Sequence, residues 1–204
     1  MTAPDVDTRD HRLAFLRGFL ERPTEVGSVI PSSRFLERRI VRSADLRRAR
    51  TVVELGPGTG GTTRALLRNM ASDARLLAIE INPRFVRLLR ASNPDPRLIV
   101  HEGSAQDIAP ALARYGLPAP DAVLSGIPFS TMERELGLDI LRSVRESLAP
   151  NGRFVAYQFR DRVESLGSHV FGSGSVQTEL RNVPPMRVYR WDVRRNDEDD
   201  TETD

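Results

Sequence analysis

A glycine-rich turn at residues 56–61 constrains this chain most, because an apolar run stops there and a helical pattern follows. The run from Thr51 to Leu55 is typical of a buried parallel strand, and the apolar spacing over residues 62–70 indicates a helix that packs back on it. Glycine lacks a Cβ atom, so the backbone of such a turn can approach a bound nucleotide closely. The alternating glycines are Gly56, Gly58 and Gly60.

Acidic or hydroxyl side chains follow each of the first three predicted strands. Glu54 stands two residues before the first glycine, and a second apolar run, residues 76–79, ends in Glu80. An acid at the end of a second strand can accept hydrogen bonds from both hydroxyls of a ribose. A third such position lies within residues 103–107. A plain strand-to-helix turn gives no reason for these acids, and a dinucleotide-binding turn would need Gly61 as its last glycine.

With these residues the chain resembles the class I S-adenosylmethionine-dependent methyltransferases, whose Glu-x-Gly-x-Gly-x-Gly motif is matched from Glu54 to Gly60. The resemblance implies S-adenosyl-L-methionine as the cofactor. It assigns cofactor binding to Glu54, Gly56, Gly58, Thr59, Gly60, Glu80, Ile81, Ser104, Ala105 and Ser125.

The rhythm of the chain predicts a single Rossmann-like α/β domain with a doubly wound, mostly parallel sheet and an antiparallel C-terminal hairpin. The predicted strands are 51–55, 76–80, 97–101, 122–125 and 153–159, and the hairpin is 176–182 with 187–193. The predicted helices are 8–22, 33–42, 62–70, 104–114 and 138–148, with another that begins at Asn82-Pro83 and a glycine- and serine-rich loop at 167–175.

The length of 204 residues and the apolar content of 39% predict one domain with a sizeable core. We divide the chain into an N-terminal helical membrane-binding or lid segment (1–50), a methyltransferase domain (51–195) and an acidic tail (196–204). The absence of cysteine excludes disulfides and thiolate catalysis, and the three histidines share no metal-ligand spacing, so no metal site is expected. Without a long apolar run or a signal peptide, we expect a cytoplasmic protein.

Charge is distributed unevenly along the chain. All 30 basic residues are arginine, and residues 9–50 hold eleven of them against five acids. The stretch from Asn196 onward holds six acids and no base. Either arginine is simply the solvated base that this chain uses, or the basic body attracts a polyanion such as nucleic acid or an anionic membrane surface.

The predicted helix over residues 8–22 is amphipathic, with a bulky apolar side flanked by arginines. Such a helix can lie in a lipid headgroup layer or dock on the catalytic domain, and both interpretations stay open. The segment 27–33 that follows it can close over the cofactor as a lid. The residues that we expect to contact lipid are Arg12, Phe15, Leu16, Phe19 and Arg22.

A second resemblance is more specific. The stretch 22–34, Arg-Pro-Thr-Glu-Val-Gly-Ser-Val-Ile-Pro-Ser-Ser-Arg, is similar to one in the bacterial phospholipid N-methyltransferases. Three later elements also match that family: Ser-Gly-Ile-Pro at 125–128, Gln-Phe at 158–159 and Arg-Asn-Val-Pro-Pro at 181–185. The likeness extends from about Phe15 to Trp191. It departs at residues 160–162, where Arg-Asp-Arg replaces Tyr-Gly-Pro, and in the acidic tail.

The end of the fourth strand decides the substrate class, because it faces the methyl group in this architecture. Ribosomal RNA adenine dimethylases carry Asn where this chain has Gly126, so the side-chain acceptor for an adenine amine is missing. Resemblance to the phospholipid family therefore implies methylation of the phosphatidylethanolamine headgroup amine, through mono- and dimethyl forms to phosphatidylcholine. The alternatives are an rRNA or DNA adenine N6-methyltransferase and a non-catalytic binding protein.

The reaction needs alignment of a neutral amine with the methyl group and exclusion of water. Candidate catalytic residues at the amine are Ser125, Gly126, Ile127, Tyr157 and His169. We expect an anionic membrane surface and a phospholipid as partners, no stable nucleic-acid partner, and peripheral association with the inner face of the cell membrane. The number of methylations, the lipid preference and the oligomeric state stay open.

Overall fold

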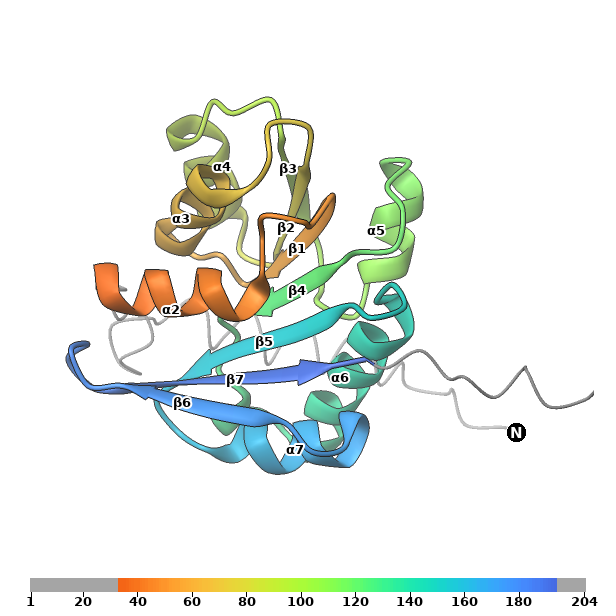
Figure 1. The fold of residues 1–204 in the computed structure, drawn as a ribbon. Helices are drawn as coiled ribbons and strands as arrows, with labels where there is room; N and C mark the ends of the chain where they lie inside the picture. Colours follow the sequence, from red (N-terminus) through yellow and green to blue (C-terminus); the bar gives the residue numbers. More distant parts are fainter. Residues whose placement is uncertain (1–32, 194–204) are drawn as a thin grey trace, which may run out of the picture.

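Seven strands form one mixed sheet in the order β3-β2-β1-β4-β5-β7-β6 (Figure 1). The structure is a computed structural model that describes residues 33–193. The strands are β1 (Thr51–Leu55), β2 (Arg75–Glu80), β3 (Leu98–Glu102), β4 (Ala122–Ser125), β5 (Arg153–Gln158), β6 (Ser175–Glu179) and β7 (Met186–Asp192). This confirms the predicted mostly parallel sheet with an antiparallel C-terminal hairpin.

The strand order reverses between β1 and β4. Strands β1 to β5 are parallel to their neighbours, with Leu55 opposite both Ile79 of β2 and Ser125 of β4. Strand β7 then pairs antiparallel with β5, and β6 pairs antiparallel with β7 at the edge. Ligands of open α/β sheets bind where the order reverses, outside the carboxyl ends of the strands. The topology therefore directs attention to the loops after β1 and β4.

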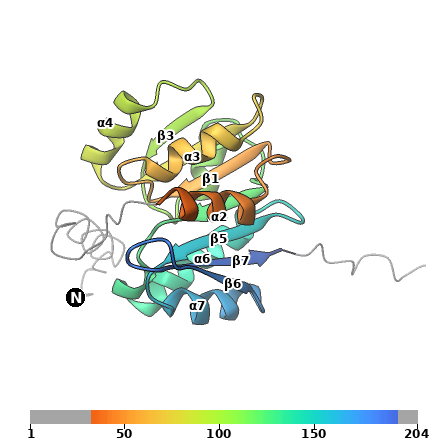
Figure 2. The same ribbon diagram turned by 60° about the vertical axis from the view of Figure 1, so that its left-hand side comes forward.

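Helices cover both faces of the sheet (Figure 2). On one face lie α2 (Arg34–Ala44), α3 (Gly61–Asn69) and α4 (Pro83–Ser92), and on the other α5 (Ile108–Arg114), α6 (Arg134–Ser147) and α7 (Arg162–Phe171), with the 3-10 helix η1 (Phe129–Thr131). Alternating side chains of the central strands enter the two cores in turn. Val52 packs beneath α2 and α3, whereas Val53 faces α5 and α6.

Helix α2 is anchored on the sheet although we assigned it to the N-terminal segment. Ser33 caps it by accepting a hydrogen bond from the Leu36 amide (3.2 Å), as expected for a serine that precedes a helix. Leu36 and Ile40 are fully buried against strands β4, β5 and β7. The division of the chain into three segments is otherwise untested and stays a prediction.

Several predicted boundaries were wrong. Helix α6 begins at Arg134 rather than at residue 138, and β6 ends at Glu179 rather than at residue 182. Residues 104–107 form a turn, so α5 begins only at Ile108, because the Asp107 carboxylate accepts from the Ser104 amide (3.0 Å). Residues 162–171, expected to become a loop from Gly167 onward, form α7 instead. Gly167 is buried in this helix against the Trp191 ring. A Cβ on residue 167 would overlap that ring, which explains why a glycine stands inside a helix.

The predicted helix 8–22 and the acidic tail, with the lipid-contacting residues expected on that helix, lie outside the described residues. Within residues 33–193, no helix is long and apolar enough to span a bilayer.

Candidate active site

The loops that follow β1, β2 and β4 lie side by side at one edge of the sheet. Backbone hydrogen bonds continue beyond the strands: the Gly56 amide donates to the Ile79 carbonyl, and the Gly126 amide donates to the Leu55 carbonyl, both at 3.0 Å. The positions that the sequence predicted for cofactor and amine are thereby brought together where the strand order reverses.

The glycines of the turn have backbone conformations that other residues rarely adopt. The φ angles of Gly56, Gly58 and Gly60 are 67°, 56° and 80°, all in the left-handed region. Gly60 is the N-cap of α3, so the positive end of that helix dipole lies at the turn. A Cβ on Gly58 would meet nothing within 4 Å, which shows open space beside the turn, and the neighbouring Thr59 is exposed.

Glu80 fastens the turn to the end of β2. Its carboxylate accepts hydrogen bonds from the amides of Gly58 (3.0 Å) and Asn82 (2.9 Å). Burial raises the pKa of this carboxyl, and the hydrogen bonds from the amides of Asn82, Gly58 and Ile81 oppose the rise. A carboxylate offers about four acceptor positions, so Glu80 retains capacity for ligand hydroxyls.

Glu54 is fully buried at the end of β1 and is only half satisfied. Its Oε2 atom accepts from the Thr63 hydroxyl (2.6 Å), while Oε1 has no hydrogen-bond partner within residues 33–193. Burial raises its pKa from 4.5 to about 7, the Thr63 hydrogen bond opposes the rise, and the charge of Glu80 adds to it. A buried acceptor without a partner is costly and is characteristic of a site that binds a donor.

Ser104 and Ala105 follow β3 at the same edge and are both buried. The Gly103 amide donates to the Glu80 carbonyl (3.1 Å), which places this loop beside the end of β2. The Ser104 hydroxyl accepts from the Gln106 amide (3.2 Å), so it helps to shape the turn.

Gly126 has no room for a side chain. A Cβ there would lie 2.6 Å from the Tyr157 hydroxyl and 3.2 Å from the Gly56 carbonyl oxygen. The preceding Ser125 is buried, and its hydroxyl accepts from the Ile127 amide (3.2 Å). The loop after β4 therefore presents backbone, and the space beside it is occupied by the tyrosine from β5.

Tyr157 lies on the same face of the sheet as Glu54. Burial raises the pKa of its hydroxyl, the nearby Glu54 carboxylate adds to the rise, and a hydrogen bond with Thr62 opposes it. The phenol therefore stays protonated at neutral pH and acts as a hydrogen-bonding group.

His169 is the one proposed catalytic residue that the structure does not bring to this edge. It is exposed in the last turn of α7. Phe171, two residues after His169, stacks on Phe154 near the start of β5. The end of α7 therefore lies at the opposite end of β5 from Gln158.

Sequence reasoning did not foresee the contacts by which several polar side chains position the site. Gln158 donates through its side-chain amide to the Ile127 carbonyl and so fixes the loop after β4. Thr63 holds Glu54, and Asn82 caps α4 by accepting from the Arg84 amide (2.9 Å). The position of Asn82 at the start of α4 confirms the helix start that the sequence predicted at Asn82-Pro83.

These residues fit a cofactor that carries hydroxyls and a positive charge. The open space beside Gly58, the half-satisfied Glu54 and the spare acceptor positions of Glu80 supply a cradle and acidic oxygens. No group of three or more His, Cys, Asp or Glu side chains within residues 33–193 could hold a metal ion.

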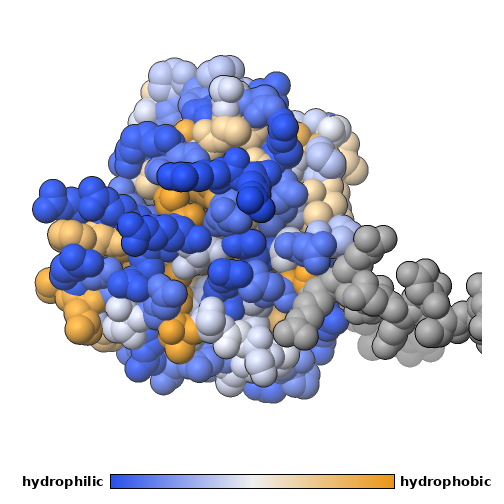
Figure 3. Space-filling model, in the orientation of Figure 1, coloured by the Kyte–Doolittle hydropathy of each residue, from blue (hydrophilic) through white to orange (hydrophobic). Residues whose placement is uncertain are grey.

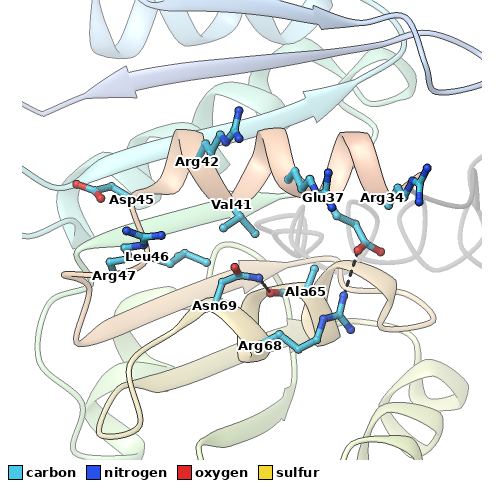
Figure 4. Close-up of a pocket in the computed structure, with 11 residues that line it drawn as sticks. Arg34, Glu37, Val41, Arg42, Asp45, Leu46, Arg47, Ala65, Arg68 and Asn69 are labelled. Atoms are coloured by element: carbon cyan, nitrogen blue, oxygen red, sulfur yellow. Dashed lines mark hydrogen bonds and ion pairs between the residues drawn. The ribbon is translucent and has the colours of Figure 1, made fainter.

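A second depression lies between α2 and α3 (Figure 4). It has a volume of about 640 Å³, and Glu37 and Arg68 pair across it at 3.1 Å. Its lining contains none of the residues predicted for the cofactor. The lining residues are Arg34, Glu37, Arg38, Val41, Arg42, Asp45, Leu46, Arg47, Ala65, Arg68 and Asn69.

Comparison with known proteins identifies relatives among methyltransferases. Residues 24–109 match the family model of ribosomal RNA adenine dimethylases. This range includes the glycine turn and the end of β2. A ribosomal RNA small subunit methyltransferase A from Caulobacter vibrioides is 42% identical over 95 residues, which cover 46% of this chain and 34% of that protein.

A longer match comes from an ornithine lipid N-methyltransferase of Singulisphaera acidiphila. It is 35% identical over 184 residues, covering 86% of this chain and 92% of that protein.

Solved structures share the fold at low identity. The 1,6-didemethyltoxoflavin-N1-methyltransferase of Burkholderia thailandensis, solved with S-adenosylhomocysteine, has a TM-score of 0.66 at 15% identity and covers 96% of this chain and 94% of that one. The O-methyltransferase TomG of Streptomyces achromogenes, solved with S-adenosylmethionine, has a TM-score of 0.62 at 17% identity, with 90% of each chain covered. These comparisons support S-adenosylmethionine as the cofactor, and the chain belongs to the class I S-adenosylmethionine-dependent methyltransferases.

Proposed function

We propose that this methyltransferase methylates the primary amine of a membrane-lipid headgroup, with phosphatidylethanolamine as the substrate. The observation that carries the proposal is the contact between Gly126 and Tyr157. The tyrosine hydroxyl fills the space where a side chain on residue 126 would begin. An adenine amine would find no asparagine acceptor there, whereas a flexible aliphatic amine needs only a narrow approach to the methyl group.

The relatives support a lipid amine over a nucleic-acid base. The Singulisphaera relative, named for N-methylation of a lipid, aligns along nearly its whole length. The match to the Caulobacter ribosomal RNA methyltransferase spans less than half of this chain. A ribosomal RNA small subunit methyltransferase A of Thermobifida fusca matches over 76% of this chain and 64% of that protein at 29% identity, which is below the lipid enzyme on each of the three measures.

The protein's residues need only position the substrate amine and exclude water. The bound cofactor supplies an already activated methyl group, so the protein must orient the amine in line with it and keep water out. A free aliphatic ammonium has a pKa of about 10 by analogy with lysine and must lose its proton before it can attack. Tyr157, protonated at neutral pH, orients the neutral amine by hydrogen bonding and does not act as its base.

The contacts of the loop after β4 also define a path for the amine. Gln158 occupies the Ile127 carbonyl, so that oxygen serves to fix the loop. The amine then passes between the backbone at Gly126 and the Tyr157 hydroxyl. Product release as the mono- or dimethyl lipid leaves the same amine able to return for another methyl group.

Ornithine lipid is a second candidate substrate, favoured by the 35% identity with the Singulisphaera enzyme. Both lipids present a primary amine at a membrane surface, so both can meet the same requirement at Gly126.

The test is transfer of a radiolabelled methyl group from S-adenosylmethionine to three acceptors in parallel: vesicles with phosphatidylethanolamine, vesicles with ornithine lipid, and structured ribosomal RNA. We expect labelled lipid and little labelled RNA, and we expect the lipid rate to rise with pH as the amine loses its proton. Faster transfer to RNA than to either lipid would reject the proposal. Preference for ornithine lipid would retain the reaction and change the substrate.

A further inference from the structure

Exposed apolar side chains gather at the carboxyl edge of β5, outside the cofactor cradle. Leu180 and Val183, in the turn between β6 and β7, are 74% and 89% exposed, and Phe159, directly after β5, is 53% exposed. Gln158 of β5 and Thr178 of β6 both stand opposite Arg187 of β7, so the three apolar residues follow strands that end at one level. Hydrophobic surface is visible over the β6–β7 turn at the left of Figure 3.

The turn holds its polar side chains inward and its apolar ones outward. Asn182 is buried, and its side chain accepts from the Ser33 amide and donates to the Pro184 carbonyl, both at 2.9 Å. Glu179 is buried too. It accepts hydrogen bonds from the backbone and side chain of Arg181 and from the side chain of Arg39. Hydrogen bonds on both sides of the turn therefore hold Leu180 and Val183 in exposed positions. Exposed apolar side chains that are held in this way are typical of an interaction surface.

Arginines lie next to these apolar residues in the sequence. The Arg181 guanidinium lies 4.1 Å from the centre of the Phe35 ring, and that of Arg34 lies 4.9 Å from the same ring. The Arg181 side chain is 63% exposed, so it can still reach an anion. Arg160 and Arg162 follow Phe159 and are exposed.

The carboxylates nearest to these apolar residues do not oppose an anionic partner. Hydrogen bonds from the Arg181 backbone and side chain and from Arg39 lower the pKa of Glu179 to about 2, so at neutral pH it is charged and paired with these arginines. Asp161 pairs with Arg187 at 3.2 Å. Exposed apolar side chains with exposed arginines next to them in the sequence match the boundary between the phosphate layer and the acyl chains of an anionic bilayer.

We propose that Leu180, Val183 and Phe159 form a membrane-docking surface that inserts into an anionic bilayer while Arg181 and Arg160 contact lipid phosphates. This surface is separate from the predicted helix 8–22. It rests on the proposed function in one respect: docking at this edge brings the loop after β4 against the layer that holds the lipid amine.

The absence of cysteine from the chain allows a single environment-sensitive fluorophore to be placed at will. The full-length protein is labelled at Leu180→Cys or Val183→Cys. Matched controls are Val176→Cys, near the start of the edge strand β6, and Leu88→Cys on α4, which are also exposed apolar residues. With vesicles of phosphatidylglycerol and phosphatidylethanolamine, we expect about a twofold or greater blue-shifted enhancement at 180 and 183 only. Equal responses at all four positions, or a response at 180 and 183 to structured RNA but not to vesicles, would overturn the proposal.

A paired substitution separates docking from catalysis. Leu180→Glu with Val183→Glu should reduce vesicle flotation and methylation of vesicle lipid about tenfold, whereas Leu88→Glu with Val176→Glu should leave both within about twofold. Transfer to a short-chain lipid amine dissolved as monomers should be unaffected by either pair. Undiminished flotation of the 180/183 variant would defeat the docking surface and leave the proposed function standing. Insertion of the labelled residues without methylation of any lipid amine would defeat the proposed function and leave the surface standing.

Discussion

Replacing Glu54 by Gln should stabilise the cofactor-free protein while weakening its cofactor binding. Glu54 is fully buried with one unpartnered oxygen, and burial raises its pKa from 4.5 to about 7. Each pKa unit corresponds to about 1.4 kcal/mol, so ionising Glu54 inside the fold costs about 3 kcal/mol more than ionising it in the unfolded chain. Glutamine keeps the shape and removes the charge, and its carbonyl can still accept from Thr63.

The sign follows from proton binding. Between about pH 4.5 and pH 7 the folded state retains the Glu54 proton that the unfolded state has released, so stability falls as pH rises through this window. The glutamine variant lacks this dependence. Its stability relative to the wild type should therefore rise by about 3 kcal/mol between pH 4.5 and pH 8 and level off above pH 7.

Urea unfolding of both proteins from about pH 4.5 to pH 8 measures the difference between their free energies of unfolding. A contribution of the amide that does not depend on pH cancels when the change in this difference with pH is taken. Calorimetry at pH 8 should show weaker S-adenosylmethionine binding by the variant, because an amide N–H group can replace the unpartnered oxygen. A difference in stability that does not change with pH would refute the assignment of Glu54 as a buried, partly protonated acid.

Three further predictions test other parts of the site and fold. Glu80→Ala should weaken cofactor binding by about 2–3 kcal/mol, since it removes charge-assisted hydrogen bonds, and unchanged affinity by calorimetry would remove Glu80 from the site. Gly126→Ala should lower lipid methylation about a hundredfold through collision with the Tyr157 hydroxyl, with cofactor affinity retained, and full activity in the transfer assay would contradict it. Gly167→Ala should destabilise the fold by about 1–3 kcal/mol because its Cβ overlaps Trp191, whereas the exposed Ser168→Ala should not; equal urea midpoints would disprove this packing.

The order of strands and helices could be predicted because local sequence patterns determine it. Apolar runs that stop in glycine or an acid marked β1, β2 and β4, and Asn82-Pro83 marked the start of α4. The glycine turn and Glu80 identified the cradle for the same reason, since residues at the ends of neighbouring parallel strands must meet.

What sequence reasoning missed depends on contacts between distant residues. A glycine within 162–171 predicted a loop, and only the Trp191 ring explains why that glycine is compatible with a helix. Likewise, Gly126 predicted a missing acceptor, but the hydroxyl that fills the space comes from β5. Glu80 was expected to face a ribose, and its role in fastening the Gly58 amide was not foreseen.

The most direct test of the central claim is the lipid composition of a bacterial host that makes phosphatidylethanolamine but none of its methylated forms. Mass spectrometry of total lipids should reveal mono-, di- or trimethylated phosphatidylethanolamine when the wild-type chain is expressed, and none when Glu80→Ala is expressed at the same level. Ribosomal RNA from the same cells should carry no additional methylated adenine. Unmodified lipids together with newly methylated ribosomal adenine would contradict the account.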